Sequence, residues 1–175
     1  MLDVAVSFNR YKFLGNEFLT WLWYIIENDI KRLNSIIGYG AHLEIGNRIV
    51  FEKRSEDSAT EKIIIKGDDA GLEEGLLSLK KGAVVTELNL VLRVAEKRWQ
   101  FTVKGESFHI TQIKIPDAPT VETGHDTENI VLEKAELCEK MFMTVDSLYA
   151  SFIKLRISDR WKNFEVLGMK KWING

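Results

Sequence analysis

The sequence predicts a single α+β domain in which an antiparallel meander sheet of about four to six strands packs against two helices. The first helix is aromatic-rich and lies near the N-terminus, and the second is a long C-terminal helix. Two features of the apolar pattern indicate helices: a broad apolar arc after Asn16 and a helical period from Glu128 to about Ile157. Alternation of apolar and polar residues between Val84 and Lys104 indicates strands. A length of 175 residues with 45% hydrophobic and 29% charged composition fits one domain over residues 1–175.

Composition limits the compartment. Cys138 is the only cysteine, so no internal disulfide can form, and a free thiol fits a reducing environment. The N-terminus lacks the basic and apolar regions of a signal peptide. The longest uncharged apolar run, between Glu17 and Glu27, is about half of what a bilayer requires. We therefore expect a cytoplasmic protein without a membrane partner, associated with the nucleoid if it binds DNA.

The N-terminal segment predicts a strand followed by a helix. Val4, Val6 and Phe8 alternate with smaller or polar residues, which indicates a short strand. Asn16 is then a suitable N-cap for a helix from Glu17 to about Leu33. On a helical wheel this helix has one apolar arc. The arc contains Phe18, Leu19, Leu22, Trp23, Ile25, Ile26, Ile30 and Leu33.

Two aromatic residues fall outside this arc. Tyr24 lies among polar residues on the wheel, and Trp21 lies at their border. An exposed aromatic pair predicts a surface for a partner, so Trp21 and Tyr24 are candidate partner-interface residues. The alternative is that a neighbouring loop or strand covers them.

The next part of the chain predicts short strands and one helix. Glycines delimit the segments Ala41–Ile45 and Arg48–Lys53, which predict a hairpin around Gly46-Asn47. The K-I-I-I-K run at Lys62–Lys66 predicts a strand buried on both faces. A short helix over Leu72–Lys80 follows, and Gly82 ends it.

The clearest strand signal lies between Val84 and Lys104. Trp99, Phe101 and Val103 alternate with polar residues, so this segment pairs with the preceding strand as an antiparallel hairpin. The apolar residues expected on one face of that preceding strand are Val84, Leu88, Leu90, Leu92 and Val94.

The meander continues through Ser107–Ile115, where a change of apolar parity between Ile110 and Ile113 predicts a bulge. An acidic loop from Asp117 to Thr127 precedes the long C-terminal helix. Asp159 is placed to cap one more short helix, which carries Arg160, Trp161, Lys162 and Phe164.

No pattern typical of an enzyme or a metal site is present. The histidines are far apart, no serine lies in a nucleophile elbow, and no phosphate-binding glycine loop occurs. We therefore expect no catalytic residues, no metal, no cofactor and no small-molecule substrate. Adjacent Asp68 and Asp69 leave a metal-dependent nuclease as a minor alternative, because two-metal chemistry needs clustered carboxylates.

Charge is unevenly distributed along the chain. The net charge is −2, yet residues 154–175 carry six bases and two acids. Basic groups can neutralise phosphates, and tryptophans can stack on bases of single strands. The alternative is that these charges are solvated and that Trp161 and Trp172 dock on the core. The candidate nucleic-acid-binding residues in this tail are Lys154, Arg156, Arg160, Trp161, Lys162, Lys170 and Lys171.

Several motifs together resemble the RdgC family of recombination-associated proteins, specifically the C-terminal half of its longer members and their divergent short branch. They are F-L-T-W-L-W at Phe18–Trp23, K-K-G-A-V-V-T-E-L-N-L at Lys80–Leu90, W-Q-F-T-V at Trp99–Val103 and M-T-V-D-S-L-Y-A-S-F-I at Met143–Ile153. The similarity extends over about residues 14–161.

The resemblance implies a non-specific DNA-binding protein that assembles as a homodimeric ring around duplex DNA and restrains RecA-dependent recombination. Lys81 is the basic residue that falls on a family-like motif.

The alternative is a protein-interaction or oligomerisation module without DNA binding. Its partner would be bound through Trp21, Tyr24, Leu132 or Met143, which are apolar residues on otherwise polar helix faces.

Overall fold

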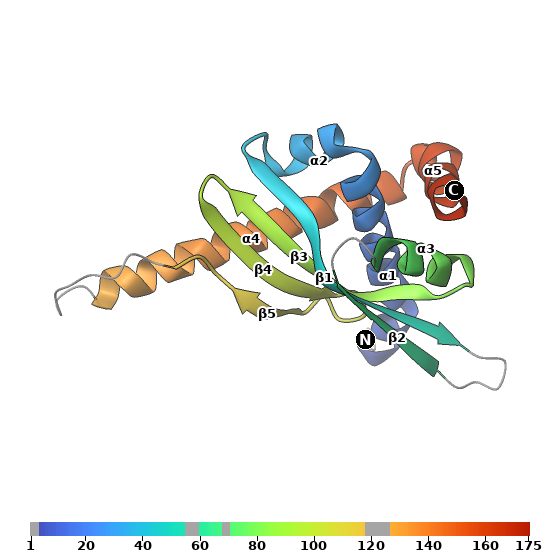
Figure 1. The fold of residues 1–175 in the computed structure, drawn as a ribbon, viewed down its shortest axis with the longest axis horizontal. Coiled ribbons are helices and arrows are strands. Elements are labelled where there is room, and N and C mark those ends of the chain that lie inside the picture. The colour runs from blue at the N-terminus through green and yellow to red at the C-terminus, as the bar shows by residue number, and fades with distance from the viewer. Residues whose placement is uncertain (1–3, 55–59, 68–70, 118–126) are drawn as a thin grey trace.

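The computed structural model describes residues 4–54, 60–67, 71–117 and 127–175. These residues form five α-helices, one short π-helix and five β-strands (Figure 1). The helices are α1 (Val4–Asn28), α2 (Ile30–Ile37), α3 (Gly71–Lys80), α4 (Thr127–Arg156), the π-helix η1 (Trp161–Glu165) and α5 (Val166–Asn174). The strands are β1 (Ala41–Arg54), β2 (Thr60–Lys66), β3 (Val84–Val94), β4 (Lys97–Lys104) and β5 (Ile110–Lys114).

The strands form one antiparallel sheet in the order β2-β1-β3-β4-β5, which confirms the α+β class. The order itself could not be obtained from the sequence. The chain leaves β2 at one edge, passes through α3 and returns on the other side of β1, so β1 lies between β2 and β3 (Figure 1). The last three strands form the expected meander.

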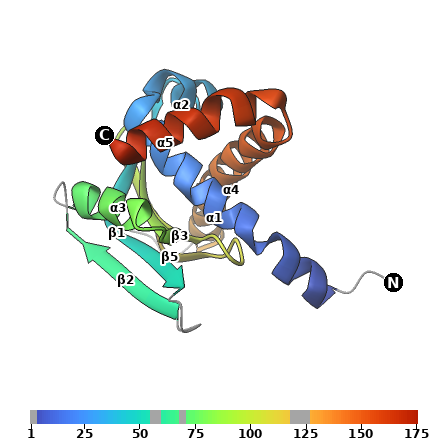
Figure 2. The same ribbon diagram turned by 90° about the vertical axis from the view of Figure 1, so that its right-hand side faces the viewer.

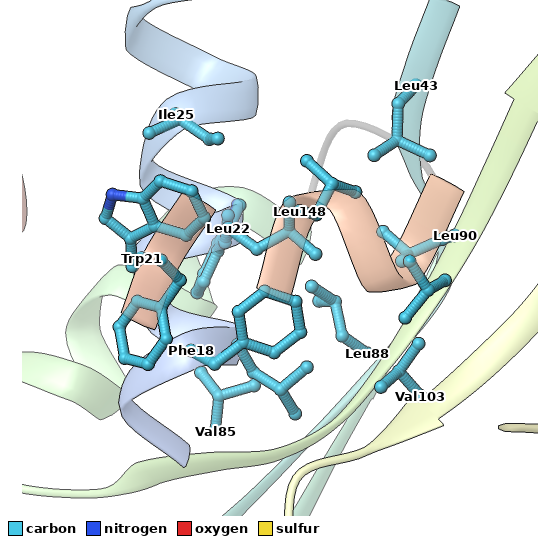
Figure 3. Packing of buried hydrophobic residues seen from close by; sticks show 14 of the residues in the cluster. Phe18, Trp21, Leu22, Ile25, Leu43, Val85, Leu88, Leu90, Val103 and Leu148 are labelled. Carbon is cyan, nitrogen blue, oxygen red and sulfur yellow. The ribbon is translucent and has the colours of Figure 1, made fainter. Parts of the chain in front are cut away.

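The described helices pack on one face of the sheet. Figure 2 shows α1, α4 and α5 on one side and the strands on the other. Figure 3 shows how Phe18, Trp21 and Leu22 of α1 meet Leu88 of β3 and Leu148 of α4, all at most 1% exposed. Burial of a large apolar side chain contributes about 1.5 to 3 kcal/mol, so α1 is a major part of the core, as the sequence predicted.

The predicted N-terminal strand is wrong, because α1 begins at Val4. An alternation of three apolar residues is too short to specify a strand, whereas extending a helix adds one hydrogen bond per residue. Asn16 therefore lies inside α1. The helix ends at Asn28, and the Asp29 side chain then accepts a hydrogen bond from the Arg32 amide (3.1 Å) to cap α2.

The predicted hairpin at Gly46-Asn47 is also wrong, because β1 runs without interruption from Ala41 to Arg54. Ile45 pairs with Leu90 and Ile49 with Leu88, so three residues of β1 lie opposite Asn89 alone. A glycine and an asparagine suit a bulge as well as a turn, and the pairing with β3 decides between them.

Two predicted burial patterns differ from the structure. The Lys62–Lys66 strand exists as part of β2, but β2 is an edge strand and most of its residues are exposed. Val84 is 44% exposed while Val85 is buried. The cause is a second bulge, because Val50 pairs with Glu87 and Phe51 with Val85, which leaves Thr86 as the extra residue.

The other predicted elements are confirmed. The helix after Gly71 ends before Gly82, which has the positive φ of +84° that favours glycine. The β3–β4 hairpin, the bulge in β5 and the long helix α4 are present. The short helix expected after Asp159 is a π-helix that continues into α5, but its N-cap is Arg160 without a side-chain hydrogen bond, so the predicted cap by Asp159 is wrong.

Candidate functional site

The described helices leave the other face of the sheet uncovered, and we call it the open face (Figures 1 and 2). Partners across an antiparallel ladder point to the same side, so the register identifies the residues on this face. Among the described strand residues, seven bases and three acids point this way. The bases are Arg48, Lys62, Lys66, Arg93, Arg98, Lys104 and Lys114, and the acids are Glu44, Glu52 and Glu87.

Ion pairs neutralise part of this charge. Glu87 accepts from Arg48 (2.9 Å) and lies 3.4 Å from the Lys62 ammonium, and Glu44 pairs with Arg93 (2.9 Å). Four of the bases have no acidic partner within the part of the chain that the structure describes. They are Lys66, Arg98, Lys104 and Lys114.

A groove of about 720 Å³ lies on this open face. It is lined by residues from both edge strands and from the strands between them, which requires the sheet to curl until its edges approach each other. Of the described residues, three bases and no carboxylate line it. The lining residues are Asn47, Arg48, Lys66, Gly67, Asn89, Gln100, Gln112, Ile113 and Lys114.

The predicted basic tail does not contribute to this groove. Trp161 is buried and meets Phe152 edge to face, with ring centroids 5.5 Å apart. Arg156 donates to Glu17 (2.7 Å), and Arg160 lies 3.7 Å from Glu165. The Trp161 ring is therefore already packed, which favours the alternative in which this tryptophan docks on the core.

The remaining predicted bases are exposed but lie apart from the groove. Lys154 lies in the last turn of α4, Lys162 lies in η1, and Lys170 and Lys171 lie in α5, on the helical side of the molecule (Figure 2). Lys81 is exposed in the turn after α3. Trp172 packs on Trp23 with centroids 5.1 Å apart, which confirms the alternative in which the tail docks on the core.

The prediction that Trp21 lies on an exposed face is wrong. Its exposed fraction is 0%, because α1 is covered by α4 as well as by the sheet, and its ring packs against Phe152 (5.6 Å). Tyr24 is half-buried, and its ring packs on Trp172 (5.6 Å). A helical wheel assumes that a helix buries only one face. In the structure α1 is covered on more than one face, so Trp21 is buried although it lies at the border of the apolar arc.

A partly buried ion pair joins the C-terminal segment to α2 beside Tyr24. The carboxylate of Glu165, 5% exposed, accepts a hydrogen bond from Arg32 of α2 (2.6 Å). Burial raises the pKa of the Tyr24 hydroxyl, the negative charges of Glu165 and Asp29 raise it further, and Arg32 lowers it. These contacts join η1 and α5 to the core, and we assign them a structural role.

Two apolar residues named in the alternative without DNA binding are exposed on α4. Leu132 is 61% exposed and Met143 is 60% exposed. Asp68 and Asp69, and most of the acidic loop after Asp117, lie outside the described residues. Within the described ranges, no three histidine, cysteine or acidic side chains are grouped so that they could hold a metal ion. No described helix has the length and hydropathy to cross a bilayer.

Comparisons with known proteins found no match: no family model, no curated protein and no solved structure is similar to this chain. The resemblance to the RdgC family is therefore still a prediction.

Sequence reasoning missed the groove. Arg48, Lys66 and Lys114 are far apart in the chain, and each appeared as one base in a short strand. A partial signal was present, because the even spacing from Lys62 to Lys66 places both on one face of β2. The curl that brings β5 close to β2 has no local sequence signature.

Proposed function

We propose that this chain binds DNA without base preference, through contacts between the phosphate backbone and the open face of the sheet. The observation that carries this proposal is the groove, where Arg48, Lys66 and Lys114 gather on a chain whose net charge is −2. Clustered bases attract phosphates and release counterions, which gives binding that does not depend on sequence.

The side chains of the open face favour the backbone over the bases as the DNA contact. Among its described residues the register places no Phe, Tyr or Trp on this face, and the aromatic residues of β4, Trp99 and Phe101, point into the core. Proteins that hold single strands stack bases on exposed aromatic rings. We therefore propose duplex DNA as the ligand. A role in recombination rests on the RdgC resemblance alone.

Reversing two charges in the groove tests this function. Lys66→Glu combined with Lys114→Glu is expected to weaken binding to a duplex at least ten-fold, and to lower the slope of log affinity against log salt by about 0.9 for each lost phosphate contact. The measurement is fluorescence anisotropy with one labelled duplex at several salt concentrations.

The matched control makes the same change of charge in the tail, Lys170→Glu with Lys171→Glu. This variant is expected to retain most of the affinity, because both residues lie on the helical side. An equal loss of affinity in the two double variants would show that the groove is not the preferred contact surface and that the tail contributes as much. Affinity that does not change with salt would contradict DNA binding through phosphates altogether.

The homodimer implied by the resemblance is proposed to form through α4. In Figure 1 this helix extends beyond the sheet, and Val131, Leu132, Phe142 and Met143 are 44% to 62% exposed along it. Exposed apolar side chains grouped on one element favour a protein contact over solvent. An isologous contact between two copies would bury them symmetrically.

Light scattering after size exclusion tests the dimer. The wild type is expected at twice the chain mass of 20.1 kDa, and Leu132→Glu with Met143→Glu at the monomer mass. Tyr39→Glu is the control, because Tyr39 is 83% exposed in the turn before β1. A monomeric wild type at high concentration would remove this proposal and leave DNA binding to be judged separately.

A further inference from the structure

Two irregularities of the sheet meet at the groove. The bulge of β1 places Gly46 against Asn89, where a Cβ at position 46 would lie 2.0 Å from the Asn89 side-chain oxygen. In β5, Gln112 has a φ of +54°, unusual for a residue other than glycine, at the register shift opposite β4. Bulges redirect side chains, and strained backbone is concentrated at functional sites. Residues of both irregularities line the groove, Asn47 and Arg48 from β1 and Gln112 from β5.

A chain of side-chain hydrogen bonds forms the floor of the groove. The Gln100 amide donates to Asn89 Oδ1 (3.0 Å), and Asn89 Nδ2 donates to Thr102 Oγ1 (3.0 Å). Thr102 Oγ1 in turn donates to Gln112 Oε1 (2.9 Å). Asn89 is 3% exposed and Thr102 is 1% exposed, so the centre of this network is buried and preorganised, while Gln112 at its end is exposed.

The donor-to-acceptor order of these hydrogen bonds decides whether Gln112 offers its oxygen or its NH₂ group to the groove. The Thr102 hydroxyl accepts from Asn89 and has one hydrogen to give, so Gln112 must accept through Oε1. Its Nε2 then has two N–H groups with no partner among the described residues. Gln112 lines the groove together with Arg48, Lys66 and Lys114. The groove therefore combines the Gln112 amide with two lysines that have no acidic partner among the described residues and with Arg48, which is ion-paired to Glu87. Amide and cationic donors in one groove suit a phosphate group.

We propose that this groove contains a phosphate subsite, in which the Gln112 amide, Arg48, Lys66 and Lys114 bind one phosphate group. The inference rests on the DNA-binding function proposed above and deepens it, because it assigns one backbone phosphate to a preorganised position among otherwise diffuse charge contacts. The same chemistry suits a free phosphate compound, and the experiment separates the two sources.

The test uses the full chain labelled with ¹⁵N and titrated at constant ionic strength with inorganic pyrophosphate and, separately, with a short DNA duplex. Saturating shifts of the Gln112 side-chain amide are expected with both ligands. Gln112→Glu retains an oxygen for Thr102 but replaces the donor with a negative charge, and it should weaken pyrophosphate binding about ten-fold or more, since a charge-assisted hydrogen bond is lost.

Arg98→Gln is the matched control, because Arg98 lies on the same open face but does not line the groove. It should lower the salt slope of DNA binding and leave the pyrophosphate titration unchanged. Circular dichroism verifies the fold of each variant, and Lys114→Gln replaces Gln112→Glu if the latter is unfolded.

The outcomes separate the two proposals. Shifts spread evenly over the open face, with equal effects of Gln112→Glu and Arg98→Gln, would overturn the subsite and leave salt-dependent DNA binding standing. Saturation by pyrophosphate without binding to the duplex would support the subsite, overturn the DNA proposal and identify a free phosphate compound as the ligand. No response to either ligand would overturn both.

Discussion

Gly15→Ala is expected to lower the free energy of unfolding by roughly 3 kcal/mol, the upper end of the usual cost of overpacking. A Cβ at Gly15 of α1 would lie 1.7 Å from the carbonyl oxygen of Gly105, in the turn between β4 and β5. The Gly105 amide donates to Thr86 of β3 (2.9 Å), so this turn is anchored and cannot withdraw. Two backbones would therefore have to separate.

Helix propensity alone would make Gly15→Ala stabilising, because alanine in a helix interior is favoured over glycine by about 1 kcal/mol. A loss of stability would therefore report the contact with Gly105. Gly40→Ala is the control, since a Cβ there meets no atom within 4 Å. Urea unfolding followed by circular dichroism measures both variants. If Gly15→Ala were as stable as the wild type, α1 would not cross the turn at Gly105 in the way that the structure shows.

Trp21→Ala is expected to lower the free energy of unfolding by about 3 to 5 kcal/mol, as for other large aromatic residues truncated in a core. The ring is fully buried between Phe18 (6.2 Å) and Phe152 (5.6 Å), with the Arg32 guanidinium 5.6 Å from its centroid. Removal of the indole leaves a cavity that these neighbours cannot fill without moving.

Thermal and urea unfolding of Trp21→Ala also distinguish a core residue from a partner contact. Leu167→Ala is the control, because Leu167 is 59% exposed on α5 and its truncation should change stability little. If Trp21→Ala left the free energy of unfolding unchanged but altered the oligomeric state, Trp21 would be a partner-contact residue, as the helical wheel predicted.

The strongly periodic elements were predictable, and the irregular ones were not. The alternation around Trp99 and Phe101 and the stripe along α4 each span many residues, so one structure fits them better than any other. The segments at Val4 and at Gly46 are short or contain turn-forming residues. Long-range pairing and packing decide their structure, and a local pattern cannot reveal it.

The candidate site was less predictable than the fold. The tail bases were selected because they are close together in sequence, yet Trp161, Arg156 and Arg160 are used within the molecule, by packing or by ion pairs. The groove residues were overlooked because each is a single polar residue in an alternating strand. Function on the face of a sheet depends on which strands are neighbours, and this is a non-local property.

By itself the sequence determined the α+β class, a core built on the aromatic helix α1, the β3–β4 hairpin and the long helix α4, because hydrophobic periodicity is a local property that burial rewards directly. Only the tertiary structure decided the strand order, the enclosure of Trp21 and the meeting of Arg48, Lys66 and Lys114. The physical reason is that strand pairing, sheet curl and helix coverage arise from contacts between segments distant in sequence.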